Sequence, residues 1–210
     1  MINILIADDH AVVRKGLTQI LSEIPDMVIG GEASDGDEVL GMVQPGATNV
    51  IILDITMPGR SGLEVLRDLR REHPEIPVLV LSMHPEEQFA RRLLREGASG
   101  YMNKETAPEE LVQAVRKVHS GGRYVSERFA EELAFSLRGG APLASHESLS
   151  IREYQVLCMI GSGKTVGQIA ANLSLTVKTI STYRSRLLEK MGLQNNAEMI
   201  RYVIDNQLFV

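Results

Sequence analysis

The chain has 210 residues, enough for one large domain or two small ones. Its composition is 44% hydrophobic and 23% charged, and no apolar run approaches the roughly 18–20 residues that a transmembrane helix needs. A single cysteine, Cys158, excludes an internal disulfide and a zinc site built from cysteines. No secretory signal opens the chain, so we expect a cytoplasmic protein without a membrane partner.

The charge is unevenly divided along the chain. Residues 1–146 hold 15 Lys and Arg against 22 Asp and Glu, whereas residues 147–210 hold 7 against 5. The basic C-terminal third could approach nucleic acid that the acidic part would repel, although this small excess lies within ordinary scatter.

Short apolar runs alternate with helix-patterned segments over the first 120 residues. The expected strands are Ile2–Ala7, Val28–Ala33, Val50–Leu53, Pro77–Ser82 and Gly100–Met102. The expected helices are Ala11–Glu23, Asp35–Val43, Gly62–Glu72, Glu86–Glu96 and Pro108–Ser120. Strands that alternate with helices predict an α/β fold, in which helices cover both faces of a parallel sheet.

The strand signal stops after this region. Helical spacing predicts a helix over Arg123–Leu137, and the Gly-, Pro- and Ser-rich stretch 138–146 predicts a linker. Four helical segments follow, two of which open with capping-box patterns at Ser150 and Thr165. The expected divisions are an α/β domain over 1–121, a helical extension and linker over 122–146, and an all-α domain over 147–210.

Polar residues stand where four of the predicted strands end. They are Asp8 and Asp9 after the first strand, Asp54 after the third, Ser82 at the end of the fourth and Lys104 after the fifth. Taken singly, each is explained as a helix cap or a solvated loop residue. Together they are expected to converge, because the carboxyl ends of parallel strands share one edge. Clustered carboxylates favour Mg²⁺, and a carboxylate beside Mg²⁺ and an ammonium group can act as a nucleophile toward a phosphoryl group.

These residues also carry a family resemblance. In order and spacing, the chain resembles the receiver domain of two-component response regulators at Asp8-Asp9, at residues 53–62 (LDITMPGRSG), at Ser82 and at residues 97–104 (GASGYMNK). The resemblance covers residues 1–121 and implies a flavodoxin-like, doubly wound sheet of five parallel strands. It implies further that a sensor histidine kinase or a small phosphodonor transfers a phosphoryl group to Asp54.

The resemblance implies a role for each residue of the site. The implied magnesium ligands are Asp9, Asp54 and the backbone carbonyl of Thr56, with Asp8 acting through water. Lys104 would pair with the phosphoryl oxygens, and Ser82 and Tyr101 would form the switch that reports phosphorylation. Glu105 stands after Lys104, where many receivers carry proline, so a trans peptide bond is expected there.

The C-terminal third contains two amphipathic helices joined by a short turn. The apolar stripe of the first consists of Val166, Ile169, Ala170 and Leu173, and that of the second of Val177, Ile180, Leu187, Leu188 and Met191. This arrangement predicts a helix-turn-helix, and the cationic and hydroxyl residues off the second stripe suit DNA. The residues alone fit a solvated bundle helix equally well.

The segment 161–165 (GSGKT) ends like a phosphate-binding P-loop. A P-loop would require glycine at position 158, where Cys158 stands, and the preceding segment has helical rather than strand spacing. We interpret these glycines as a turn between helices.

A second resemblance covers residues 147–208. Segments 149–153 (LSIRE), 168–170 (QIA), 173–180 (LSLTVKTI) and 187–191 (LLEKM) resemble a LuxR-type helix-turn-helix domain. With the receiver, this is the architecture of NarL/FixJ-type response regulators. The implied DNA-facing residues are Lys178, Thr179, Ser181, Thr182, Ser185 and Arg186. The last helix, Ala197–Leu208, would pair domains into dimers, although its apolar residues equally suit a bundle core.

The implied function is transcription regulation, not enzymatic turnover. Mg²⁺-dependent phosphorylation of Asp54 would control dimerisation and sequence-specific DNA binding. The implied partners are DNA, a sensor histidine kinase and a second copy of the chain, and RNA polymerase is a possible further partner. Two alternatives remain: an Mg²⁺-dependent phosphohydrolase that uses the same carboxylates, and a regulator whose DNA affinity ignores phosphorylation.

Overall fold

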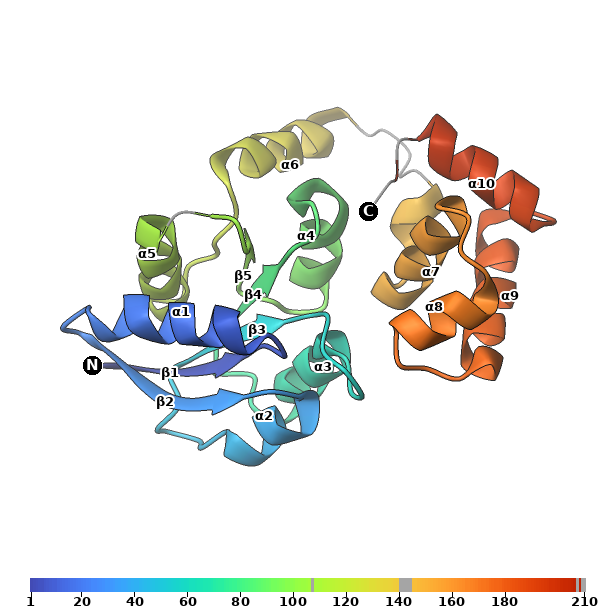
Figure 1. Ribbon diagram of the computed structural model, residues 1–210. Coiled ribbons are helices and arrows are strands. Elements are labelled where there is room, and N and C mark those ends of the chain that lie inside the picture. The colour runs from blue at the N-terminus through green and yellow to red at the C-terminus, as the bar shows by residue number, and fades with distance from the viewer. Residues whose placement is uncertain (107, 140–144, 207, 209–210) are drawn as a thin grey trace. The chain divides into compact units, whose positions relative to one another are not determined.

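The chain forms two compact units, Met1–Arg138 and Gly139–Val210 (Figure 1). The structure is a computed structural model that describes residues 1–106, 108–139, 145–206 and 208. Residues 140–144, inside the predicted linker, lie outside the described residues. Within the described part, no helix combines the length and apolar character that crossing a membrane would require.

Five parallel strands form the sheet of the first unit. They are β1 (Ile2–Ala7), β2 (Met27–Ala33), β3 (Val50–Asp54), β4 (Val78–Ser82) and β5 (Gly100–Asn103). Their order, β2-β1-β3-β4-β5, confirms the predicted doubly wound sheet. The order reverses between β1 and β3, and ligands of such sheets bind outside the carboxyl ends at this reversal.

Helices cover both faces of this sheet (Figure 1). Helices α1 (Ala11–Ser22) and α5 (Pro108–His119) pack on one face, where Leu21 and Val115 join Ile4 and Ile52 in the core. The helices of the other face are α2 (Gly36–Met42), α3 (Gly62–Glu72) and α4 (Glu86–Arg95). Because side chains alternate along a strand, burial on both faces explains the nearly continuous apolar runs of β1 and β3.

The last helix of the first unit, α6 (Glu127–Gly139), begins later than predicted. The sequence predicted helix from Arg123, but Tyr124 forms a β-bridge with Gly100 of β5. The N–H of Tyr124 donates to Ser99 O (3.1 Å), and its carbonyl accepts from Tyr101 N (2.8 Å). These bonds extend the sheet edge and prevent a helical turn at this position.

The second unit is helical throughout its described residues. Its elements are the 3-10 turn η1 (Ser145–Ser148) and the helices α7 (Ile151–Gly161), α8 (Val166–Asn172), α9 (Val177–Met191) and α10 (Asn196–Asp205). Both predicted capping boxes form, at Ser150 and Thr165. Ile180 and Leu187 of α9 are buried, as predicted, whereas Val177 is 55% exposed and does not belong to the buried stripe.

The final helix is shorter than predicted. Helix α10 ends at Asp205, and the predicted end, Leu208, lies beyond it. The N–H of Leu208 donates to Val203 O, five residues earlier, at 3.0 Å, and bonds of this kind commonly close helix C-termini. The Leu208 side chain is buried, so its position is determined by packing and not by an extension of helix α10.

Candidate functional site

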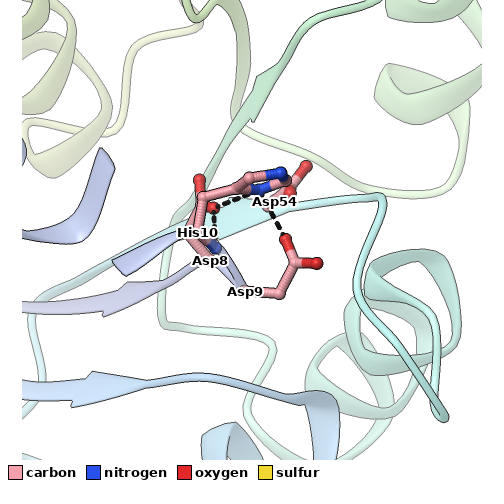
Figure 2. Close-up of side chains that lie close together, drawn as sticks. All are labelled: Asp8, Asp9, His10 and Asp54. Carbon is pink, nitrogen blue, oxygen red and sulfur yellow. Dashed lines mark hydrogen bonds and ion pairs between the residues drawn. The ribbon is translucent and has the colours of Figure 1, made fainter. Parts of the chain in front are cut away.

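Two buried carboxylates meet where the strand order of the first unit reverses. Asp8 follows β1 and Asp54 ends the neighbouring strand β3, and each side chain is 2% exposed. Ligand atoms of Asp8, Asp9, His10 and Asp54 all lie within 4.8 Å of one another (Figure 2). The structure therefore brings the three predicted aspartates together and adds a histidine to them.

Lys104 supplies a cation to this cluster. It directly follows β5, and its backbone N–H donates to Ser82 O of β4 at 2.9 Å. Its Nζ lies 2.6 Å from Asp8 Oδ2 and 2.9 Å from Asp54 Oδ2, and the side chain is only 5% exposed. Among the described residues no peptide bond is cis, which agrees with the trans bond expected after Lys104.

The electrostatics of the pair follow from burial and proximity. Burial raises the pKa of Asp54, and the attraction of Lys104 only partly offsets this. Burial alone would lower the pKa of Lys104, but hydrogen bonds and charge from Asp8 and Asp54 raise it overall. With three aspartates and one ammonium, the pocket offers surplus carboxylate oxygens, a donor set that fits Mg²⁺.

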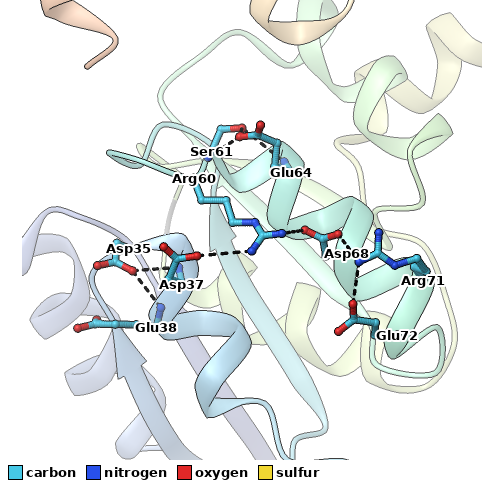
Figure 3. Close-up of polar contacts among 9 residues, drawn as sticks. All are labelled: Asp35, Asp37, Glu38, Arg60, Ser61, Glu64, Asp68, Arg71 and Glu72. Atoms are coloured by element: carbon cyan, nitrogen blue, oxygen red, sulfur yellow. Dashed lines mark hydrogen bonds and ion pairs between the residues drawn. The ribbon is translucent and has the colours of Figure 1, made fainter. Parts of the chain in front are cut away.

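The loop between β3 and α3 is shaped to approach Asp54. The N–H of Thr56 donates to Asp54 Oδ1 at 3.1 Å. A Cβ atom at Gly62 would lie 2.0 Å from the Asp54 carbonyl oxygen, so a residue without a side chain is required there. Ser61 caps α3 through a capping box with Glu64, which fixes where the loop ends (Figure 3).

Arg60 anchors the same loop to two helices (Figure 3). Its guanidinium forms an ion pair with Asp68 of α3, and its Nη1 lies 3.5 Å from Asp37 Oδ1 of α2. Asp68 is also paired with Arg71, at 2.7 Å. These contacts hold the segment that carries Thr56, so Arg60 acts on the pocket from outside it.

Ser82 and Tyr101 are both hydrogen-bonded to the backbone of His84. Both of their side chains are buried. The Tyr101 hydroxyl donates to His84 O at 2.6 Å, and the His84 N–H donates to Ser82 Oγ at 3.2 Å. The His84 ring stacks on Phe89 of α4, with the ring centroids 4.4 Å apart. A change at Ser82 would therefore reach the start of α4 through a single residue.

In the second unit, helix α9 presents the predicted polar face. Of the six predicted residues, Thr179 is half-buried and the others are exposed: Lys178, Ser181, Thr182, Ser185 and Arg186. The hydroxyls of the two serines and Thr182 donate to carbonyl oxygens four residues earlier, at 2.9–3.1 Å. Within the residues that the structure describes, the two cations have no ion-pair partner.

Comparisons with known proteins identify both units. The response regulator receiver domain matches residues 4–116, more than half of the chain. The chain belongs to the response regulators. The bacterial regulatory proteins of the luxR family match residues 147–203, so this response regulator has the NarL/FixJ arrangement of a receiver followed by a LuxR-type domain.

Relatives of this response regulator match it over most of its length. Response regulator UvrY of Escherichia coli (strain K12) is 35% identical over 212 residues, which cover 99% of this chain and 96% of the relative. Response regulator GacA of Pseudomonas aeruginosa is 38% identical over 200 residues, which cover 95% of this chain and 94% of the relative.

Solved structures agree with the fold. RcsB from Salmonella enterica serovar Typhimurium, bound to a promoter in the presence of the phosphomimetic BeF3⁻, is 27% identical with a TM-score of 0.67, covering 96% of this chain and 98% of that chain. The response regulator ChrA of a heme-sensing two-component system is 30% identical with a TM-score of 0.54, covering 99% and 98%.

Sequence reasoning missed several residues around the site of this response regulator. His10 stands beside the aspartate pair, a position that could have drawn attention, and Arg14, one helical turn later, donates to the Asp8 carbonyl oxygen. Arg60 lies in the segment 53–62 that carries the receiver resemblance, but its ion pairs with α2 and α3 depend on the fold, and no sequence signal marks His84.

Proposed function

We propose that this response regulator controls transcription through phosphorylation of Asp54 by a sensor histidine kinase in the cytoplasm. The observation that carries the proposal is the Lys104 ammonium group, which lies between the buried carboxylates of Asp8 and Asp54 at the reversal of strand order. This is the arrangement needed to accept a small, highly charged group in one fixed place.

Phosphoryl transfer would begin with attack by an Asp54 carboxylate oxygen on the phosphorus atom of a phosphohistidine. The new oxygen–phosphorus bond forms as the nitrogen–phosphorus bond breaks, and the imidazole nitrogen keeps that electron pair and takes a proton from solvent. Lys104 remains an ammonium group and pairs with the phosphoryl oxygens. In the present structure its Nζ lies 2.9 Å from Asp54 Oδ2.

Mg²⁺ would neutralise charge on the phosphoryl oxygens when bound. We assign its direct ligands to Asp9, Asp54 and the backbone carbonyl of Thr56, with Asp8 acting through water. The clustering of these carboxylate oxygens and the anchored loop that carries Thr56 support this assignment.

The switch would pass through Ser82 and Tyr101. A phosphoryl group on Asp54 offers new acceptors for the Ser82 hydroxyl, whose oxygen now accepts from the His84 N–H. His84 joins both residues to α4 through Phe89, and α4 is tied to the start of α6, because the N–H of Ser126, the residue before α6, donates to Glu86 Oε1 at 2.9 Å. Rearrangement of Ser82 would thus bias α4 and the helix that leads into the linker.

DNA binding would use α9. Lys178 and Arg186 would meet phosphates, and the hydroxyls of Ser181, Thr182 and Ser185 would turn from their own helix toward the groove. Thr179 would contribute from the edge of this face. The RcsB complexes with DNA support this assignment by similarity.

Dimerisation of the phosphorylated form, with contact to RNA polymerase, completes the proposal. A shift from 1:99 to 99:1 in favour of the dimer-forming state would need about 5.5 kcal/mol of differential interaction, which the phosphoryl group and Mg²⁺ must supply together.

The test is acetyl-phosphate labelling of the full chain with Mg²⁺, read by intact mass. The wild type should gain one phosphoryl group (about 80 Da), and Asp54→Asn should gain none. Labelling that persists in Asp54→Asn would place the acceptor elsewhere. Many turnovers of phosphodonor per chain, without an adduct, would instead indicate a phosphohydrolase.

A further inference from the structure

His10 belongs to the aspartate cluster and has no part in the function proposed above. Its Nδ1 lies 2.7 Å from Asp9 Oδ1 and 3.2 Å from Asp8 Oδ1 (Figure 2). Its backbone N–H also donates to Asp8 Oδ1, at 2.8 Å. One residue therefore holds both members of the aspartate pair.

The two aspartates depend on His10 to different degrees. Asp8 is buried and also pairs with Lys104. The Asp9 side chain is 30% exposed, and in the described part of the chain its carboxylate has no interacting side chain other than His10. Without that contact the Asp9 carboxylate would sample several orientations, and fixing one of them on metal binding would cost conformational entropy.

We propose that His10 is a positioning residue that orients Asp9 for a divalent cation, through the close contact of its Nδ1 with Asp9 Oδ1. The inference rests on the proposed function, because Asp9 is there a magnesium ligand. The His10 Nδ1 is hydrogen-bonded to Asp8 Oδ1 at 3.2 Å and lies 2.7 Å from Asp9 Oδ1, so His10 holds Asp9 Oδ1 beside the buried Asp8 and leaves Asp9 Oδ2 to the cation. Groups that hold a ligand in this way commonly change metal affinity by about 10–100-fold when removed.

Two substitutions of His10 test the contact between its Nδ1 and Asp9. The His10 side chain is 63% exposed, so substitution creates no cavity in the core. His10→Phe keeps a flat ring but has no donor. His10→Asn restores a donor, because the Asn Nδ2 is separated from Cα by the same number of bonds as the His Nδ1.

The experiment measures binding of Mg²⁺ and Mn²⁺ to the full chain by calorimetry. His10→Phe should bind Mg²⁺ at least about tenfold more weakly than wild type, and His10→Asn should regain most of the affinity. In acetyl-phosphate labelling, His10→Phe should need correspondingly more Mg²⁺ for half-maximal rate but reach the wild-type rate at saturation, which a general structural defect would not allow.

Three results would overturn the inference. They are wild-type affinity in His10→Phe, no recovery in His10→Asn, and a pulsed-EPR nitrogen coupling between bound Mn²⁺ and His10, which would make the imidazole a direct ligand. Absence of Mg²⁺ binding in the wild type would instead contradict the magnesium assignment on which the inference rests.

Discussion

The receiver pocket and the α9 face use similar side chains in opposite ways. In the pocket, Lys104 is 5% exposed and lies within ion-pair distance of two aspartates that are 2% exposed. On α9, Lys178 and Arg186 are exposed and, among the described residues, have no ion-pair partner. A buried charge must be paired because desolvation is costly, whereas an exposed charge keeps its water until a charged partner displaces it.

The hydroxyl groups of the two regions differ in the same way. Ser82 Oγ accepts from the His84 N–H, and His84 O accepts from the Tyr101 hydroxyl on β5, so movement of Ser82 must disturb both residues. Ser181 and Ser185 bond to carbonyls of their own helix. They can rotate toward a new partner at little cost. The pocket therefore suits the small phosphoryl group that we propose it registers, and α9 suits the large polyanion that we propose it binds.

Removing the buried cation should have the largest effect on stability. Lys104→Met leaves Asp8 and Asp54 buried without their partner, so we expect the free energy of unfolding in chelator to fall by about 3 kcal/mol. Mg²⁺ should restore more stability to this variant than to wild type, because the ion replaces the lost charge. Urea unfolding of the full chain measures both effects.

The matched control is Arg186→Met, the same kind of change on the exposed face. It should alter the free energy of unfolding by no more than about 0.5 kcal/mol. Equal destabilisation by both substitutions would remove the distinction between the two regions.

Substitution of the α9 cations should weaken DNA binding without affecting phosphorylation. Lys178→Ala and Arg186→Ala should each lower the slope of log affinity against log salt by about 1, because each removes one phosphate contact. The measurement is fluorescence anisotropy on a duplex selected from a random-sequence pool. Lys190→Gln is the control on the same helix. This substitution should leave the slope unchanged, because Lys190 is already paired with Glu153 at 2.8 Å. A wild-type slope in both cation variants would exclude them from phosphate contact.

The smallest expected effect concerns Glu153, the charged member of a capping box in the second unit. Burial would raise the pKa of Glu153, but Lys190 and the Ser150 cap lower it overall, so its stabilisation is present above the ordinary carboxyl pKa and lost as pH falls through the folded value. Glu153→Gln should cost about 1 kcal/mol at neutral pH and less in acid.

Gln168 provides the control for this pH dependence, because it closes the equivalent box of α8 without charge. Gln168→Ala should cost the same at every pH. Denaturation of both variants at several pH values distinguishes them, and a pH-independent cost for Glu153→Gln would mean that its charge is not involved.

The sequence predicted the strand ends well because apolar runs and strand–helix alternation are local signals. Asp8, Asp54 and Lys104 could be placed at one edge from chain order alone, and the structure brings them within 3 Å contacts. The bridge of Tyr124 to Gly100 could not be foreseen, because it depends on a sheet edge that exists only in the fold. The same holds for Arg60, whose partners lie on two different helices.

The most direct test of the account is the DNA affinity of the full chain, measured with and without acetyl phosphate and Mg²⁺. The same measurement is made on Asp54→Asn, and the phosphoryl adduct is quantified in every sample. We predict that wild-type affinity rises in proportion to the single adduct, while Asp54→Asn stays at the unphosphorylated value. A fully labelled wild type with unchanged DNA affinity, or equal tightening in Asp54→Asn, would contradict the claim that the pocket controls the α9 face.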